Sequence, residues 1–468
     1  MEKLTGLDTG FYYFDSPGMH LHIGVLLIFD ASAVTPGDRL ASARKRILER
    51  IDAMEHFRDR IAEVPLGLAE PYWVADADFD IANHVKEHSD HGVLSRDELT
   101  RVAAAFISEP IDKSRPLWEL LVVRELEGGK FAVVSKLHHT LIDGVAGIEV
   151  LASLFDLEPN PKEFWGALKP APTHTPVDFD AVVRAMGNSI LSKFLRAPKD
   201  AMRVMEFVAD WLSFNAADDN SKLLRPLFTA PRTPVNGTLS RGRSIASASL
   251  PLARVKEIAH SANATVNDVV LTLVSLALDD YLGAKGFSGG ADLVAMMPMS
   301  NPRRDAVSGS NQISSLFISL ANSHSEPSDR LAAITRATGA AKKFHRSTKL
   351  EELVQLSSYV PPLLTWALSQ AVHQSRAFDF LPPAFNVLVS TVRGTDFPLY
   401  FDGSELLELI PFAPLAESSG LNLTALSYDG SLMIGAVGDA ILAGDVHVFV
   451  DAVVASLGSL AASLAQNA

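Results

Sequence analysis

The stretch KLHHTLIDG, residues 136–144, places two histidines and an aspartate at the junction of an expected strand and an expected helix. The apolar run at residues 131–137 predicts the strand, and residues 144–155 have the spacing of an amphipathic helix. A strand end exposes side chains at a sheet edge, where an imidazole can act as a general base near neutral pH. Gly144 would allow a tight turn into the helix. The stretch therefore marks a candidate catalytic site in an α/β fold.

The spacing of these residues leaves other interpretations open. His138 and His139 could be loop histidines that bond only to backbone groups. With Asp143 they could also bind a metal ion, but adjacent side chains diverge at a strand end and no further ligand cluster is evident. The sequence therefore predicts no metal site.

Outward from this stretch, the pattern predicts two α/β halves joined by an irregular connector. In the first half, residues 22–29 and 120–124 are expected strands, and residues 39–53 and 97–107 are expected helices. We expect an N-terminal domain at residues 1–158, a connector at 159–239 and a C-terminal domain at 240–468.

The second half repeats the mixture of strands and helices. Asp429-Gly430 predicts a hairpin with a type I′ turn between strands at 422–428 and 431–437. A terminal packing helix is expected at 452–465. The remaining expected elements are helices at 252–262, 266–282 and 329–343, and strands at 292–298, 314–320 and 385–392.

Five prolines between Pro159 and Pro176 break the chain inside the connector. Beyond them, residues 180–214 carry apolar side chains at helical spacing. This stripe is expected either to pack between the two halves or to form an apolar surface that meets lipid.

Composition narrows the functional classes. Of 468 residues, 47% are hydrophobic and 21% charged, as in a globular protein, and the net charge of −14 opposes binding to nucleic acid or anionic lipid. The absence of cysteine excludes disulfides, thiolate ligands and a cysteine nucleophile. No basic and apolar leader and no run of about 18 apolar residues is present, so a cytoplasmic location is expected.

The His-His-x-x-x-Asp-Gly pattern resembles the active-site motif of CoA-dependent acyltransferases, and other segments narrow the resemblance. Together they are similar to the bacterial wax ester synthase/diacylglycerol acyltransferase family, in matching order over most of the chain. Residues 390–394 read STVRG where the family usually shows SNVPG, so that turn is expected to differ. The other segments are PYWV (71–74), DFD (78–80), HV (84–85), RPLWE (115–119), VNDV (266–269), MPMS (297–300), GSNQ (309–312), NVLVS (386–390), PFAP (411–414) and GLN (420–422).

The resemblance implies two chloramphenicol-acetyltransferase-like domains, each a mixed sheet with helices, and an active-site channel between them. It implies transfer of a long-chain acyl group from acyl-CoA, a substrate rather than a cofactor, to diacylglycerol or a fatty alcohol. The products would be triacylglycerol and wax ester, formed at the inner membrane face or on lipid inclusions through peripheral contact.

The same resemblance assigns roles to individual residues. His139 would be the base, Asp143 would hold the loop, and His138 would shape a substrate channel. The segment Pro116-Leu117-Trp118 is expected to pack beneath the site.

Two further pairs are weaker candidates. Asn267 would support the oxyanion near the channel, although Asn267 and Asp268 could equally cap or pack a helix. Arg303 and Arg304 could meet the CoA phosphates, with a solvated loop as the more ordinary interpretation.

Two rival functions remain at this point. One is a condensation-type acyltransferase acting on carrier-bound substrates. The other is a non-catalytic protein of lipid inclusions, and motif retention alone does not separate it from an enzyme.

Overall fold

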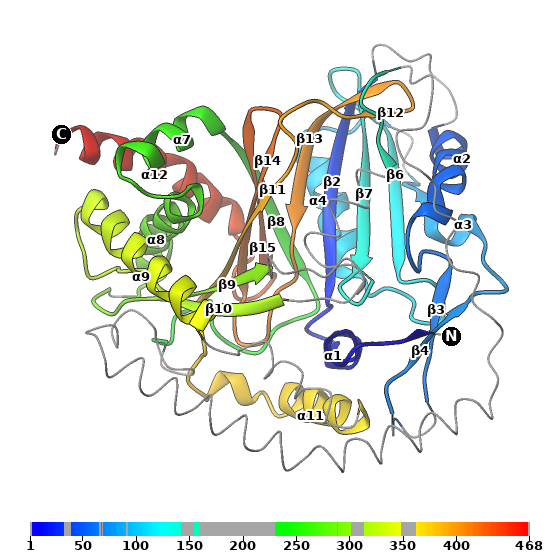
Figure 1. Cartoon of the computed structure of the whole chain (residues 1–468), viewed down its shortest axis with the longest axis horizontal. Helices are drawn as coiled ribbons and strands as arrows, with labels where there is room; N and C mark the ends of the chain where they lie inside the picture. Colours follow the sequence, from blue (N-terminus) through cyan, green and yellow to red (C-terminus); the bar gives the residue numbers. More distant parts are fainter. Residues whose placement is uncertain are drawn as a thin grey trace.

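The structure of the chain is a computed structural model (Figure 1). It describes residues 2–31, 39–64, 67, 69–89, 92–141, 154–159, 230–287, 289–300, 313–347 and 362–466.

The first of two six-stranded sheets carries the histidine pair. Its strand order is β12-β13-β2-β7-β6-β5, and neighbours are antiparallel except for the parallel pair β5 and β6. The strands are β2 (His22–Asp30), β5 (Val85–Glu87), β6 (Trp118–Leu126), β7 (Lys130–His138), β12 (Tyr400–Phe401) and β13 (Ser404–Phe412).

Two strands of this sheet come from the far end of the chain. β13 pairs with β2 from Leu406 opposite Phe29 to Phe412 opposite Gly24, and β12 pairs with β13. The second half of the chain thus completes the sheet of the first half (Figure 1). The domain limits at 158 and 239 remain predictions. The sequence pattern alone does not show that a strand from the second half pairs with β2.

The second sheet has the order β10-β9-β11-β14-β15-β8 and is mixed, because β11 runs parallel to both β9 and β14. Asp429 and Gly430 both have positive φ, 41° and 76°, which confirms the predicted turn between β14 and β15. The strands are β8 (Arg243–Pro251), β9 (Val294–Ser300), β10 (Ile313–Ser319), β11 (Val387–Arg393), β14 (Leu421–Tyr428) and β15 (Ser431–Asp439).

Helices cover the outer faces of both sheets (Figure 1). α7 (Leu252–Ser261), α8 (Val266–Ala284), α9 (Pro327–Ser347) and α12 (Val446–Gln466) lie on the second sheet, whereas α2 (Arg39–Arg50) and α3 (Ile81–His84) lie on the first. The other described elements are α1 (Gly6–Phe14), η1 (Ile51–Ala53), α4 (Arg96–Ser108), α11 (Pro362–Gln374), η5 (Ala377–Asp379) and the small sheet β1 (Glu2–Lys3), β4 (Tyr72–Ala75) and β3 (Asp59–Ala62).

The apolar residues of the predicted strands and helices form the cores. One cluster lies between the second sheet and α7, α8, α9 and α12, and another between the first sheet and α2. A third joins the two halves: β2 and α4 meet β8, β13 and β15, with Leu26, Leu99, Ile245 and Phe412 buried there. Burial across this third cluster fixes the two sheets relative to each other.

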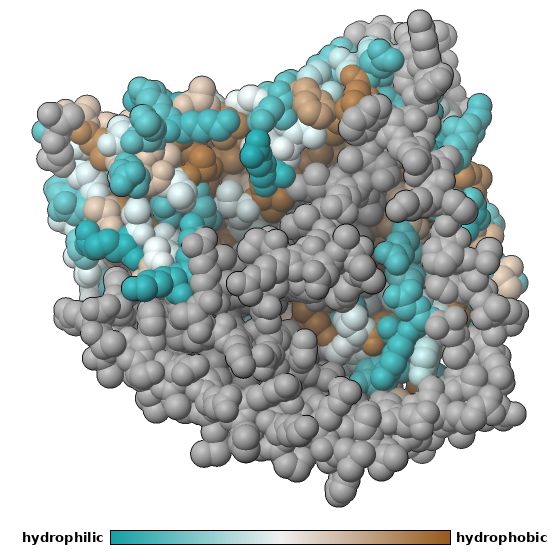
Figure 2. Space-filling view, in the orientation of Figure 1, coloured by the Kyte–Doolittle hydropathy of each residue, from teal (hydrophilic) through white to brown (hydrophobic). Residues whose placement is uncertain are grey.

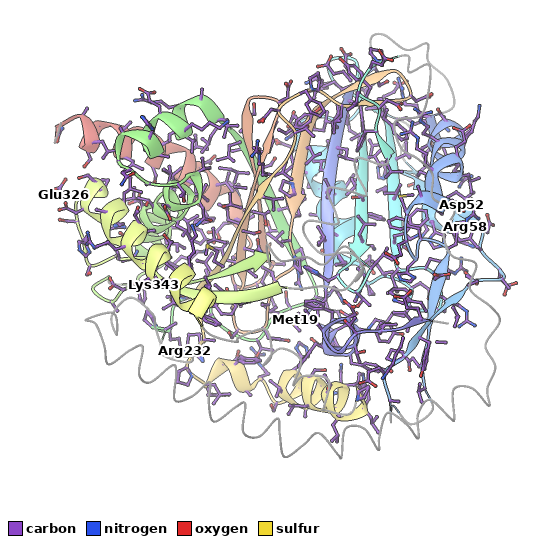
Figure 3. All side chains as sticks on the ribbon, in the orientation of Figure 1. Met19, Asp52, Arg58, Arg232, Glu326 and Lys343 are labelled. Carbon is purple, nitrogen blue, oxygen red and sulfur yellow. The ribbon has the colours of Figure 1, made fainter. Side chains whose placement is uncertain are left out.

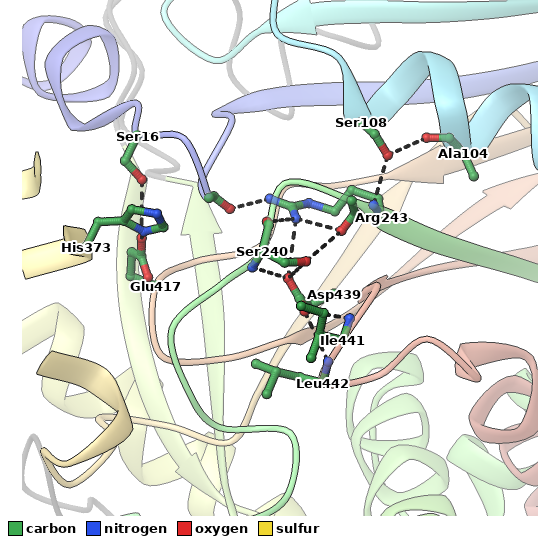
Figure 4. A network of polar contacts seen from close by, with 12 residues as sticks. Ser16, Ala104, Ser108, Ser240, Arg243, His373, Glu417, Asp439, Ile441 and Leu442 are labelled. Atoms are coloured by element: carbon green, nitrogen blue, oxygen red, sulfur yellow. Dashed lines mark hydrogen bonds and ion pairs between the residues drawn. The ribbon is translucent and has the colours of Figure 1, made fainter. Parts of the chain in front are cut away.

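Arg243, which pairs with Asp439 inside the second half, reinforces the same junction through its bonds to the first half (Figure 4). The Arg243 guanidinium lies 3.6 Å from the Asp439 carboxylate and donates to the Gly18 carbonyl, while the Arg243 amide donates to Ser108 Oγ at 2.8 Å. The Asp439 carboxylate also accepts from the amide and hydroxyl of Ser240. Since both charges are buried, removing either partner would leave an unpaired buried charge and lower the stability of the folded protein.

The C-terminal helix is longer than expected from sequence. By length and composition, α12 could cross a membrane, and so could α7 with α8 taken as one span despite a 98° bend. In this structure Phe449, Val453 and Leu460 of α12 pack into the core of the second half. The predicted strands and helices among the described residues are otherwise confirmed within a few residues at each end.

Candidate active site

His139 lies directly after β7, at the end of the first sheet nearest α1. Its amide donates to the Leu21 carbonyl at 2.8 Å, which continues the pairing of β7 with β2. Its ring stacks on Phe11 of α1, with centroids 4.8 Å apart and planes 25° apart. The side chain of His139 is partly exposed, so this imidazole can meet a substrate.

His138, by contrast, is 1% exposed and points into the protein. Its amide donates to the Leu117 carbonyl at 3.0 Å, and its Nδ1 accepts the Thr140 amide at 3.2 Å. Burial lowers the pKa of His138, and the nearby Asp15 carboxylate only partly offsets this. His138 is therefore a neutral imidazole whose Nδ1 holds the turn after His139.

Helix α1 packs against the whole histidine turn. The Thr140 hydroxyl donates to the Asp8 carbonyl at 3.2 Å, and the Tyr12 ring meets His138 edge-on at 6.4 Å. The Thr5 hydroxyl accepts the Asp8 amide and so caps α1. A capped, packed helix holds the turn in one conformation.

Asp15 follows α1 and lies beneath the histidines. Its carboxylate lies 3.0 Å from Lys113 Nζ, 3.7 Å from His20 Nδ1 and 3.8 Å from His138 Nε2, and it accepts the Leu21 amide at 3.2 Å. Burial alone would raise the pKa of Asp15, but contacts with His138 and His20 and the charge of Lys113 hold it far below its usual value. Asp15 is thus a fixed negative charge.

A buried cation, Lys136, supports strand β7. Lys136 Nζ lies 2.9 Å from the Glu119 carboxylate and donates to the Phe106 and Glu109 carbonyls. Burial lowers the pKa of Lys136, while Glu119 opposes the shift. These bonds satisfy the ammonium group, which places Lys136 in the scaffold of the site.

The Pro116-Leu117-Trp118 segment lies beside the histidine pair, at the start of the neighbouring strand β6. Leu117 and Trp118 are buried, and the Trp118 indole donates to the Phe57 carbonyl at 2.8 Å. Leu117 bonds to His138 only through its backbone carbonyl. These contacts are those of packing residues.

Asn267 and Asp268 begin α8 in the second half. Asp268 and Thr265 form a capping box, and the other Asp268 oxygen accepts the Thr338 hydroxyl at 2.6 Å. The Asn267 amide contacts Met297 Sδ at 3.2 Å. The described contacts of both residues are thus structural, and Asp268 is the third-residue partner of Thr265, the N-cap of α8.

The remaining predicted site residues, Asp143, Gly144, Arg303 and Arg304, lie outside the described residues, as does the apolar stripe at 180–214. One described cluster could hold a metal ion, formed by Glu2, Glu55 and His56, and it includes neither motif histidine.

An apolar cavity of about 40 Å³ lies between the first sheet and α2. Val133, Ser135 and Leu137 of β7 line it, together with Trp118 and Phe57. Leu137 precedes His139 by two residues, so the cavity begins near the site.

Sequence reasoning did not identify Phe11 or Asp15. Neither belongs to a pattern with the histidines, because their contacts depend on α1 folding back across the end of β7. The short segment before residue 16, with four consecutive aromatic residues from Phe11 to Phe14, offered no periodic signal.

Comparisons with known proteins identify the family of this chain. The wax ester synthase/diacylglycerol acyltransferase catalytic domain matches residues 4–270, and the C-terminal domain of the same family matches residues 309–461. A putative diacylglycerol O-acyltransferase of Mycobacterium tuberculosis is 30% identical over 93% of this chain and 86% of its own length. A probable diacylglycerol O-acyltransferase of the same organism is 28% identical over 94% of each chain.

Solved structures show the same fold. The wax ester synthase/diacylglycerol acyltransferase from Marinobacter aquaeolei VT8 matches with a TM-score of 0.69 and 22% identity, over 99% of this chain and 100% of that one. The first condensation domain of the calcium-dependent antibiotic synthetase matches with a TM-score of 0.58 and 16% identity, over 98% and 96%. The predicted two-domain, mixed-sheet α/β fold is confirmed, and this chain belongs to the wax ester synthase/diacylglycerol acyltransferase family.

Proposed function

We propose that this protein is an acyl-CoA-dependent O-acyltransferase that esterifies diacylglycerol to triacylglycerol and long-chain alcohols to wax esters. Family membership supports the reaction class. The observation that carries the assignment of the base is the contrast within the histidine pair. His139 is partly exposed beside Phe11, whereas His138 is buried and its Nδ1 is bonded to the Thr140 amide.

In this mechanism the His139 imidazole takes the proton of the acceptor hydroxyl as its oxygen attacks the thioester carbonyl. The tetrahedral intermediate collapses, the carbon–sulfur bond breaks, and the CoA thiolate takes the proton from the His139 imidazolium. A positioned base of this kind contributes about 10²- to 10⁴-fold in rate. Because the sequence has no cysteine and no credible serine nucleophile, direct transfer in a ternary complex is favoured over a covalent acyl-enzyme.

The other predicted site residues have supporting roles in this proposal. Asp143 and Gly144 shape the loop after the base, and His138 anchors its first turn. Asn267 supports the oxyanion from the second half, while Asp268 keeps its place in the capping box of α8. Arg303 and Arg304 meet the phosphates of CoA.

The acceptors are lipids, so the proposed place of action is the cytoplasmic membrane face or a lipid inclusion. α11 supports peripheral contact, because its thirteen residues include no Asp, Glu, Lys or Arg and its Leu364, Trp366 and Leu368 are 48–59% exposed. Phe380, the residue directly after η5, is also apolar and is 82% exposed. Arg232 holds η5 in place by donating to the Phe378 and Leu381 carbonyls (Figure 3).

A condensation-type reaction on a carrier-bound substrate is the second candidate, and the fold match to a condensation domain supports it. The two are separated by supplying labelled palmitoyl-CoA with diacylglycerol, with hexadecanol or with no acceptor, and identifying the ester by mass. Triacylglycerol or palmityl palmitate formed without any carrier protein is the expected product. No ester with either acceptor would contradict the proposal and favour the carrier-dependent or non-catalytic alternatives.

A further inference from the structure

The buried neighbour of the base, His138, is held in one of its two neutral forms. Nδ1 accepts the Thr140 amide, so Nδ1 carries no proton and the proton of the neutral ring is on Nε2. If the proton moved to Nδ1, two N–H groups would face each other and the Thr140 amide would lose its acceptor. The turn that begins at His139 therefore depends on the protonation of His138 at Nε2.

Asp15 supplies the charge that favours this form. Its carboxylate lies 3.8 Å from Nε2, where a negative charge stabilises an N–H that points toward it. The carboxylate is fixed by Lys113 at 3.0 Å and by the Leu21 amide at 3.2 Å, and it is 12% exposed. Little solvent is present to screen the interaction.

Lys113 makes the protonation of His138 depend on the negative charge of Asp15. Its ammonium group also donates to the Tyr12 carbonyl at 2.7 Å and lies 4.4 Å from the Tyr12 ring, so it stays near the histidines when its partner changes. Without the carboxylate, a cation would lie beside Nε2. A cation favours a lone pair on Nε2 and a proton on Nδ1, which is the form that breaks the bond to Thr140.

We propose that Asp15 is a positioning residue for acyl transfer: it fixes His138 with its proton on Nε2, so that Nδ1 holds the Thr140 amide and the turn presents His139 against Phe11. Asp15 does not touch the substrate in this arrangement. This role rests on the proposed function, because it acts through His139 as the base.

Asp15→Asn tests the role by removing the charge while keeping the size of the side chain. We expect kcat to fall at least about tenfold, with the KM for palmitoyl-CoA changed less than about twofold. ¹⁵N spectra of histidine-labelled protein should show Nδ1 of His138 changing from a hydrogen-bond acceptor to a protonated nitrogen, with His138→Gln used to assign the signal.

Asp15→Asn combined with Lys113→Met provides the discriminating variant, because it removes both charges. If the cation is what reverses the protonation of His138, the double variant should recover kcat to within about threefold of the parent. A double variant no better than Asp15→Asn, or an Asp15→Asn protein with unchanged kcat and unchanged His138 spectra, would overturn the proposal. Asp52→Asn, which removes the surface partner of Arg58, is the matched control (Figure 3).

Failure of the proposed function gives a different result, since the parent protein would then form no ester with any acceptor. The His138 spectra test Asp15 even in that case, because they do not depend on turnover.

Discussion

At the scale of single residues, the two adjacent histidines have opposite environments although the sequence presents them as a pair. The pattern predicted a strand end with a base, and β7 does end at His138. It could not decide which imidazole is accessible, because that depends on contacts with Leu117, Phe11 and Asp15 from distant parts of the chain. The same holds for Asp268 in the second half. Its capping-box bond with Thr265 is local and could be predicted, whereas its bond with the distant Thr338 could not.

Phe11→Leu tests whether the stacked ring orients the base. Leucine keeps an apolar side chain but removes the aromatic face, and aromatic pairs contribute about 0.5–1.5 kcal/mol beyond burial. We therefore expect kcat to fall about two- to tenfold, and Phe11→Tyr to retain activity. Phe14→Leu, at an exposed position of the same helix, is the control. Equal losses in Phe11→Leu and Phe14→Leu would contradict a specific role for the stack.

At the scale of elements, the strands and helices with strong periodicity were predicted and those formed by distant pairing were not. The run at 385–392 and the hairpin around Asp429-Gly430 are local signals, and β11, β14 and β15 appear where they indicate. β12 and β13 were not predicted as strands, because β13 gains its partner only by crossing to β2 in the first sheet. α11 was also missed, as its sequence contains no Asp, Glu, Lys or Arg to mark a solvent-exposed face.

The uncharged surface of α11 is expected to bind lipid. Substituting Leu364→Ser together with Leu368→Ser removes two of its most exposed apolar side chains. Burial of such side chains contributes on the order of 1 kcal/mol each when they start half-exposed, so partitioning onto phosphatidylcholine vesicles should fall about tenfold or more.

Val448→Ser with Val454→Ser is the matched control, since these side chains are 42% and 39% exposed on α12. If the α11 substitutions leave vesicle binding unchanged, another part of the chain contacts the lipid.

At the scale of the whole molecule, one apolar cluster and the bonds of Arg243 to Gly18 and Ser108 join the two halves, and their surface is mixed. The described part of the face in Figure 2 intersperses hydrophilic and hydrophobic side chains. Composition predicted a globular protein, and the described residues do form apolar cores on each sheet and between the halves. It could not predict that β13 and Arg243 bind the halves together, because each contact joins residues more than 130 positions apart.

Buried neutral histidines make the stability of the whole protein sensitive to acid. Burial lowers the pKa of His22, His84 and His138. Below about pH 6.5 the unfolded chain binds protons at these imidazoles and the folded chain does not, so stability is lost as the pH falls. Asp15, whose pKa is held low, acts in the same direction below about pH 4.

Below about pH 6.5, each buried neutral imidazole should lower the free energy of unfolding by about 1.4 kcal/mol per pH unit. We expect Tm to fall between pH 7.5 and pH 5.5, measured by calorimetry at constant ionic strength, with a smaller fall in His22→Asn. A Tm that stays constant or rises toward pH 5.5 would show that these histidines are charged in the folded protein.

The measurement that tests the central claim most directly is CoA release from palmitoyl-CoA, followed with a thiol reagent, in the parent, His139→Ala and His260→Ala. The sequence contains no cysteine, so the protein adds no thiol signal. His260 is exposed on α7 and serves as the control. We predict release that depends on diacylglycerol or hexadecanol, falls at least about 10²-fold in His139→Ala and is unchanged in His260→Ala. Acceptor-dependent release and ester formation that persist at the parent rate in a folded His139→Ala protein would contradict His139 as the base.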